Sequence, residues 1–141
     1  MDDSQLHADG LLLRPFEDAD AAAFAVAVRE SAEGMRRWMP WSSVDYRVEQ
    51  ALQWTVDRLA ARHLRREGEG WRLDRTDFPR ELQRRLLLTM WALATGSARP
   101  PRGDSVDRAI AMAAMGKKAS LGGWLLVGGS GWSLLPAPPR R

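Results

Sequence analysis

The chain has 141 residues, of which 45% are hydrophobic and 28% charged, the size and composition of one ordinary globular domain. It contains no cysteine, which excludes disulfide bonds and thiolate metal sites, and neither His7 nor His63 stands at the spacing of metal ligands. The charge changes sign part-way along. Residues 1–56 carry five Arg against ten Asp or Glu, whereas residues 57–141 carry sixteen Lys or Arg against eight Asp or Glu.

The first elements predicted are a strand and a helix. Residues 10–16 contain the apolar run of a short strand, and Pro15 marks its end or an edge position. Acidic residues follow and favour the start of a helix because they complement its dipole. An alanine-rich helix is therefore predicted over residues 18–31, with Phe24 and Val28 on one face.

A second long helix and a strand complete the first half. Gly34 is expected to interrupt the first helix, and residues 35–39 fit one short helical turn. A helix is predicted over residues 44–67, ended by Gly68, and residues 71–73 then fit the start of a strand. The apolar stripe of this predicted helix consists of Val48, Leu52, Val56 and Leu59.

The order of these elements resembles the opening of a known enzyme family. The resemblance lies in Leu11-Leu-Leu-Arg-Pro-Phe-Glu-Asp-Ala-Asp20, in the alanine-rich helix, in Met35-Arg-Arg-Trp-Met-Pro-Trp41 and in the helix through Trp54. Together these segments are similar to a GNAT N-acetyltransferase of the ribosomal-protein N-terminal-alanine type. The resemblance covers about residues 10–72.

This resemblance implies a fold and an activity. The fold would be α+β, a mixed sheet with flanking helices, and residues 1–72 would supply its N-terminal strand-helix-helix unit. The activity would be acetyl transfer from acetyl-CoA to an amine such as a protein N-terminus. By the same resemblance Arg37, Trp38 and Trp41 would line the acceptor pocket; the alternative, that both tryptophans pack in or beside the core, stays open.

The family's most diagnostic element is missing after residue 72. The Gly-rich loop that would hold the cofactor pyrophosphate has no counterpart here, since Gly103 has no glycine partner at the right spacing. Residues 73–141 are therefore predicted to be a divergent, irregular, basic and Gly/Pro-rich region that is poorly ordered or non-native. We expect an incomplete, catalytically impaired acetyltransferase that does not bind acetyl-CoA usefully. No metal is expected, and no catalytic or cofactor-binding residue can be assigned.

A shifted reading frame is one explanation for this loss. Plausible GC-rich codons for residues 90–104, read from the third base, translate into a string that resembles the family's strand before its cofactor loop. The hypothesis is that the chain is truncated or frame-shifted relative to an ancestral gene from somewhere between residues 57 and 90. A genuinely basic, loop-rich region is the alternative.

A basic stretch suggests the alternative function. Nine arginines lie between residues 58 and 85, with Trp71 and Phe78 among them. Arginines neutralise phosphates and aromatic rings stack on bases, so the alternative is a small basic interaction protein that binds RNA or ribosomes. No nucleic-acid-binding motif accompanies them, so a solvated helix face or an out-of-frame translation is preferred and nucleic acid is not expected as a partner.

The remaining patterns concern helix 107–115 and the location of the protein. A short amphipathic helix is predicted over residues 107–115. Residues 119–139 are uncharged and long enough to span a bilayer, but their glycines make a poor helix, so a buried hairpin or a sticky tail is predicted and no membrane partner is expected. The acidic N-terminus lacks the apolar segment of a secretory signal, which predicts a cytoplasmic protein.

Overall fold

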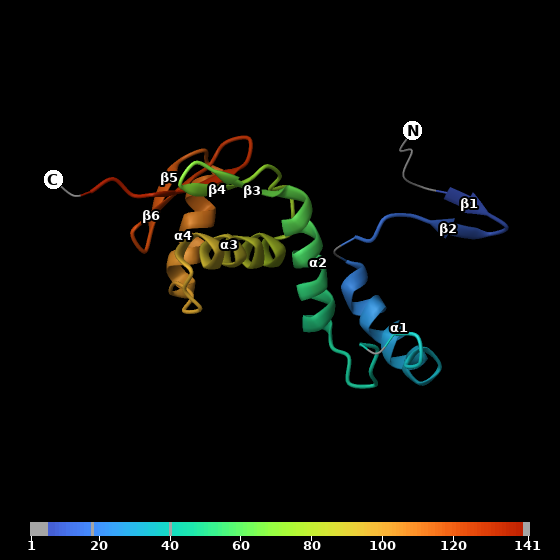
Figure 1. The fold of residues 1–141 in the computed structure, drawn as a ribbon. Coiled ribbons are helices and arrows are strands. Elements are labelled where there is room, and N and C mark those ends of the chain that lie inside the picture. The colour runs from blue at the N-terminus through green and yellow to red at the C-terminus, as the bar shows by residue number, and fades with distance from the viewer. Residues whose placement is uncertain (1–5, 18, 40, 140–141) are drawn as a thin grey trace. The chain divides into compact units, whose positions relative to one another are not determined.

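The computed structural model describes residues 6–17, 19–39 and 41–139, and within them it contains four helices and seven strands, which confirms the predicted α+β class (Figure 1). In chain order the elements are β1 (Leu6–Ala8), β2 (Leu11–Leu13), α1 (Asp20–Met35), α2 (Val48–His63), β3 (Leu64–Glu67), β4 (Gly70–Leu73), α3 (Arg80–Thr95), α4 (Gly103–Ala114), β5 (Lys118–Leu121), β6 (Trp124–Val127) and β7 (Trp132–Pro136).

The chain divides into two compact units, residues 1–55 (unit 1) and residues 56–141 (unit 2). The division falls within α2 and coincides with the reversal of charge, because residue 56 is an uncharged valine. Unit 1 therefore carries the acidic excess and unit 2 the basic excess. The boundary after residue 72 that the sequence predicts stays a prediction.

Unit 1 begins with a two-stranded hairpin. β1 and β2 pair antiparallel, with Leu6 opposite Leu13. Asp9 and Gly10 form the turn at φ 46° and 80°, the left-handed pair that a two-residue type I′ hairpin requires. The strand predicted over residues 10–16 is thus present at its centre, but among the described strands it pairs with β1 alone and not with the larger sheet.

The core of unit 1 is built on small residues of α1. This helix runs through Gly34 to Met35, four residues beyond its predicted end, and the predicted turn follows it, with Met39 N–H donating to the Met35 carbonyl oxygen at 2.7 Å. Its buried face consists of Ala21, Ala25, Val28 and Ala32. Alanines spaced in this way let larger side chains approach the helix axis, and Tyr46 and Ala51 complete the buried cluster.

The second predicted helix ends earlier than its pattern suggests. α2 stops at His63, and residues 64–67 form β3, which pairs antiparallel with β4. Gly68, at φ 58°, opens the two-residue turn between these strands, the place where a type II′ hairpin needs a glycine. The helical propensity of residues 64–67 is overridden because the hairpin satisfies their backbone groups in the sheet.

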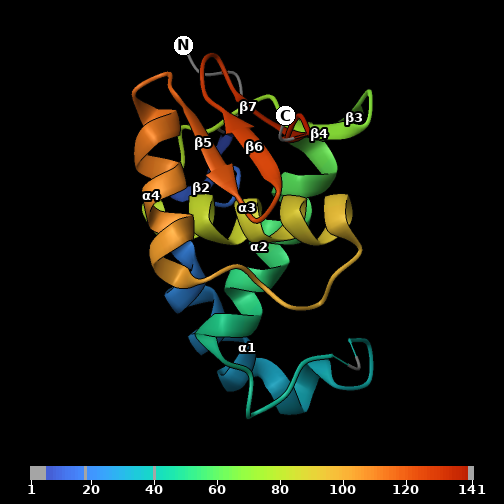
Figure 2. The same cartoon turned by 90° about the vertical axis from the view of Figure 1, so that its left-hand side faces the viewer.

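Unit 2 contains a five-stranded antiparallel sheet with the order β3-β4-β7-β6-β5. Register places Trp71 and Leu126 on either side of Leu134, so these three side chains share one face of the sheet. Helices α3 and α4 cover that face (Figure 1), and Figure 2 shows α4 beside the β5–β6 hairpin. The other face is left to solvent along part of its area, as antiparallel sheets allow.

The core of unit 2 fills the layer between this sheet and its two helices. The sheet contributes Leu73, Leu121, Leu126, Trp132 and Leu134, and the helices contribute Leu82, Leu86, Leu87, Met90, Trp91, Val106, Ala109, Ile110 and Ala113, all at most 8% exposed. A core of this size is enough to hold a unit of about 86 residues together.

A regular helix-and-sheet unit therefore replaces the predicted irregular C-terminal half. Leu82, Leu86 and Met90 stand four residues apart, which is the period of an amphipathic helix, and the arginines between them occupy its outer side. Gly96, at φ 66°, ends α3 in the left-handed conformation. The composition of residues 73–141 suggested disorder because composition alone does not show which side chains share the inner face of a helix.

The C-terminal patterns have clearer outcomes. The helix predicted over residues 107–115 is present as α4, which starts four residues earlier, at Gly103. The uncharged stretch contains the predicted hairpin, β5–β6, and then β7. In the part of the chain that the structure describes, no helix has the length and apolar character needed to cross a membrane.

Candidate functional site

Unit 1 holds a pocket of about 290 Å³ with four aromatic walls. Phe24 comes from α1, Trp54 from α2, and Trp41 and Tyr46 from the segment between these helices. The Phe24 and Trp54 rings are nearly parallel, at 12° with centroids 5.6 Å apart, and those of Phe24 and Trp41 lie at 23° and 6.5 Å. We call this the aromatic pocket.

Tyr46 closes the pocket across the parallel rings. Its ring stands at 78° to that of Phe24, with centroids 6.0 Å apart, and tilts at 55° to that of Trp41. Burial raises the pKa of the Tyr46 phenol, so this wall is neutral over the ordinary pH range. The Tyr46 carbonyl oxygen accepts a hydrogen bond from the Arg29 guanidinium at 2.6 Å, which ties the loop to α1.

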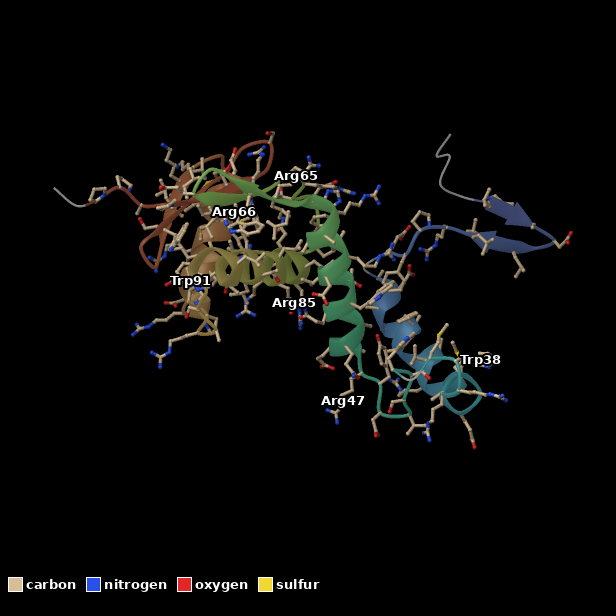
Figure 3. All side chains as sticks on the ribbon, in the orientation of Figure 1. Trp38, Arg47, Arg65, Arg66, Arg85 and Trp91 are labelled. Carbon is tan, nitrogen blue, oxygen red and sulfur yellow. The ribbon has the colours of Figure 1, made fainter. Side chains whose placement is uncertain are left out.

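The three substrate-binding residues predicted from the sequence separate in space. Trp41 lines the aromatic pocket with 52% of its surface exposed. Trp38 lies in the turn after α1, 77% exposed, and the Arg37 guanidinium stacks over its ring at 5.4 Å (Figure 3). Neither Trp38 nor Arg37 lines the pocket. Their role as substrate contacts stays a prediction, and neither tryptophan is buried in the core.

Sequence reasoning missed three of the four walls. Phe24 was recognisable as a residue on the inner face of its helix, but Tyr46 and Trp54 carried no signal that they meet it. The available clue was the density of aromatic side chains between residues 16 and 54, which include Phe16 packed edge-on against Phe24 and Trp54. Only the packing of the helices brings these rings together.

A bidentate ion pair borders this region of unit 1. The two terminal nitrogens of Arg14 donate to the two carboxylate oxygens of Asp20, both at 2.7 Å, and Glu17 N–H donates to the same carboxylate. Hydrogen bonding from Arg14, then from the Glu17 amide, lowers the pKa of Asp20 to about 2. A second cavity, of about 430 Å³, runs past this pair to Phe24.

Replacing Arg14 with glutamine should raise the pKa of Asp20 part of the way back to 3.8, its ordinary value. Because the folded-state pKa is depressed, the stabilisation from the pair is complete above the ordinary pKa and is lost as the pH falls through about 2. A carboxyl NMR titration of Asp20 would measure the shift. Arg36→Gln, which removes the same charge elsewhere in unit 1, should leave the Asp20 titration unchanged; equal shifts in both variants would contradict the assignment.

Unit 2 presents many basic side chains that are not neutralised. In the described part of unit 2, eight of them form no side-chain hydrogen bond or ion pair, and seven of the eight are exposed. They are Arg62, Arg66, Arg84, Arg99, Arg102, Arg108, Lys117 and Lys118. Others are already paired, as Arg75 is with Asp77 at 2.6 Å and Arg85 with Glu81 at 2.8 Å.

One unpaired arginine reaches the start of α4, and another comes just before that helix in the sequence. A β-carbon built on Gly103 would lie 3.5 Å from an Arg84 guanidinium nitrogen, and Arg102 directly precedes Gly103. The N-cap residue makes no side-chain cap; the Ser105 N–H donates to the Asp104 carboxylate at 3.0 Å and the Val106 N–H to the Arg102 carbonyl oxygen, so the N–H groups open to an anion are those of Gly103 and Asp104. A guanidinium group at the positive end of a helix, with a second arginine next to it in the sequence, forms a surface suited to a phosphate. We call Arg84, Arg102 and these N–H groups the basic corner.

The open face of the sheet carries a polar network. Arg72 donates to the hydroxyl oxygens of Ser133 at 3.1 Å and Ser130 at 3.2 Å, and Ser133 donates to Glu67 at 2.9 Å. Figure 3 shows Arg65 and Arg66 on opposite sides of β3, as successive residues of a strand must lie. This face therefore adds basic groups on a side of the sheet that the helices do not cover.

A histidine–aspartate pair links the end of α2 to the segment after β4. The Nδ1 atom of His63 lies 2.9 Å from Asp74, whose other carboxylate oxygen is 3.2 Å from Arg65. The two residues are also joined through the backbone, since Asp74 N–H donates to the His63 carbonyl oxygen at 3.0 Å, so the pair holds these two segments together. Within the described residues no cluster of three or more His, Asp or Glu side chains could hold a metal ion.

Comparison with known proteins gives one informative likeness. No family model matches the chain, and no solved structure matches it. The chain is 37% identical over 93 residues to a tRNA(Ile)-lysidine synthase of Zymomonas mobilis subsp. mobilis, a match that covers 66% of this chain. It spans only 28% of the length of that relative.

This likeness shows that the acetyltransferase prediction is wrong. The similarity is to a different enzyme family, and the strand, helices and turn that suggested a GNAT protein are elements that many α+β folds share. Acetyl-CoA and an amine acceptor, implied only by that resemblance, stay untested. The alternative of a free-standing protein that binds RNA or ribosomes has no direct support either, and the expectation of no nucleic-acid partner conflicts with the tRNA in the relative's name.

The likeness also corrects the frame-shift hypothesis. Wherever it begins, a match of 93 residues in a chain of 141 includes residues 49–93, and thus part of the region suspected of out-of-frame translation. Those residues resemble another protein in the frame in which they stand, and they form β3, β4 and most of α3. Over 66% of its length, this chain is similar to part of a tRNA(Ile)-lysidine synthase.

Proposed function

We propose that unit 2 is a tRNA-contacting part of a tRNA-modifying enzyme related to lysidine synthase. The observation that carries the proposal is the set of eight unneutralised basic side chains on a unit with sixteen Lys or Arg against eight Asp or Glu. The likeness to a tRNA(Ile)-lysidine synthase suggests that tRNA is the nucleic acid that unit 2 contacts. The match necessarily includes β3, β4 and most of α3, which are elements of unit 2.

Unpaired arginines are the ones best placed to bind phosphates. An arginine paired with a carboxylate is already partly neutralised, so it presents less net positive charge to a phosphate than an unpaired arginine does. Arg84 and Arg102 have no such partner among the described residues; the Arg84 guanidinium reaches the first residue of α4 and Arg102 is its N-cap residue, at a helix end that also favours an anion. The basic corner is therefore proposed as a contact with the tRNA backbone.

The salt dependence of tRNA binding tests this proposal. For the whole chain and a fluorescently labelled tRNA, the affinity should fall steeply between about 50 and 200 mM salt, because each phosphate contact releases counterions. The variant Arg84→Gln/Arg102→Gln should lower the log–log slope by about 1.4 to 1.8, since each contact contributes about 0.7 to 0.9. Fluorescence anisotropy at several salt concentrations measures both quantities.

A matched variant separates direct contacts from the general field of the protein. Arg75→Gln/Arg85→Gln removes the same two charges from arginines that carboxylates already hold, and it should leave the slope nearly unchanged. Circular dichroism would verify that both variants are folded. Equal slopes for the two double variants would reject the basic corner, and no salt-sensitive binding by the parent chain would reject the proposed function.

A further inference from the structure

We propose that the aromatic pocket of unit 1 binds a quaternary ammonium group. Its four lining residues are all aromatic: Phe24, Trp41, Tyr46 and Trp54. Aromatic rings present a negative face, and a cation within about 6 Å of several ring centroids is attracted to each of them. The Phe24 ring is stacked on those of Trp54 and Trp41, with centroids 5.6 and 6.5 Å apart, so a cation would lie beside the stacked rings and not between them, in the volume of about 290 Å³ where it is close to more than one ring.

Among the described residues no charged side chain lines the pocket, and this decides which kind of cation the pocket suits. No carboxylate in the described part of the chain lines the pocket, so a primary ammonium or a guanidinium would lose hydrogen bonds to water without replacing them. A quaternary ammonium has no N–H group to satisfy. Its methyl groups pack against the rings while its charge is attracted by their faces, which matches a pocket built only of aromatic walls.

The charge of unit 1 also favours a cation over an anion. Residues 1–55 carry five Arg against ten Asp or Glu, and seven of those ten acidic residues lie in the described part of the chain. Two of the arginines are engaged, Arg14 by Asp20 and Arg29 by the Tyr46 carbonyl oxygen. Asp45 and Glu49, close in sequence to Tyr46, form no ion pair with any described residue.

The same features argue against a nucleotide in this pocket. A phosphate would meet the acidic excess of unit 1, and the edge of a base would find no charged side chain among the four walls. The inference uses residues of unit 1 alone. It therefore stands apart from the proposed contact between unit 2 and tRNA.

The test compares choline with 3,3-dimethyl-1-butanol, a neutral molecule of the same shape, on the whole chain. Choline should bind about ten times more tightly than the neutral probe, because only the cation gains from several ring faces. Trp41→Leu should lower the affinity for choline by about tenfold, and Trp41→Phe should retain most of it. Indole NMR shifts would follow the titrations site by site.

The control tryptophan lies three residues away. Trp38→Leu removes an indole that is 77% exposed and does not line the pocket, so its affinity for choline should match that of the parent chain. Equal affinities for choline and the neutral probe would overturn the proposal in favour of a purely apolar site. Tighter binding of adenosine than of choline would overturn it in favour of a base-stacking site, and no binding of choline would refute it outright.

Discussion

Replacement of Leu86 with alanine should lower the free energy of unfolding of unit 2 by about 2 to 5 kcal/mol, the range for a fully buried leucine. Leu86 is 0% exposed and lies on the inner face of α3, which packs against β4, β7 and α4. Truncation would remove apolar contacts and leave a cavity where helix and sheet meet. Because unit stability totals only about 5 to 15 kcal/mol, this loss is a large fraction of it.

Leu93→Ala provides the matched control on the same helix. Leu93 is 49% exposed, so the same change should cost about 0.5 kcal/mol or less. Guanidinium denaturation followed by circular dichroism would give the two free energies, and segment-resolved hydrogen exchange would assign the losses to unit 2. Similar losses at both positions would show that the inner face of α3 is not the core described here.

Replacement of Gly128 with alanine should be equally damaging for a different reason. A β-carbon at this position would overlap the carbonyl oxygen and Cα of Ala113, which are backbone atoms of α4. A side chain can turn away from such a clash, but the backbone of a packed helix cannot. We expect a loss of about 3 kcal/mol or more, at the upper end of what overpacking produces.

Gly34→Ala should have the opposite sign. Gly34 lies inside α1 without a left-handed φ, and a β-carbon there would meet nothing within 4 Å. Alanine is the better helix former, so this substitution should stabilise unit 1 by about 0.5 to 1 kcal/mol. Thermal or chemical denaturation of the two variants side by side measures the contrast; destabilisation by Gly34→Ala, or tolerance of Gly128→Ala, would contradict the packing described.

Local signals in the sequence predicted several elements correctly. The acidic start and alanine run of residues 18–31 indicated α1, and the apolar stripe through Val48 and Leu52 indicated α2. These patterns succeed because helical periodicity is contained in a few consecutive turns. The same reasoning extended α2 too far, to residue 67, because helical propensity does not register the pairing of residues 64–67 with the strand that begins at Gly70.

The candidate sites were harder to predict from the sequence than the helices and strands. Trp41 was singled out, and it does line a pocket, but the family that suggested it was wrong and Trp38 and Arg37 lie outside. The basic stretch was recognised and then set aside as a solvated face. The linear pattern does not show which arginines have carboxylate partners. In the structure Arg85 pairs with Glu81, whereas Arg84 has no carboxylate partner among the described residues.

The sequence by itself determined the division of charge, since a count of residues places the reversal at the same point as the boundary between the two compact units. Other local features depend only on neighbouring residues, such as the Asp9–Gly10 turn and the end of α3 at Gly96, although they were not predicted from the sequence. Only the tertiary structure decided that β4 pairs with β7, about 60 residues away, and that four aromatic rings enclose one pocket. Such contacts depend on how separate elements pack, and no short-range pattern encodes that arrangement.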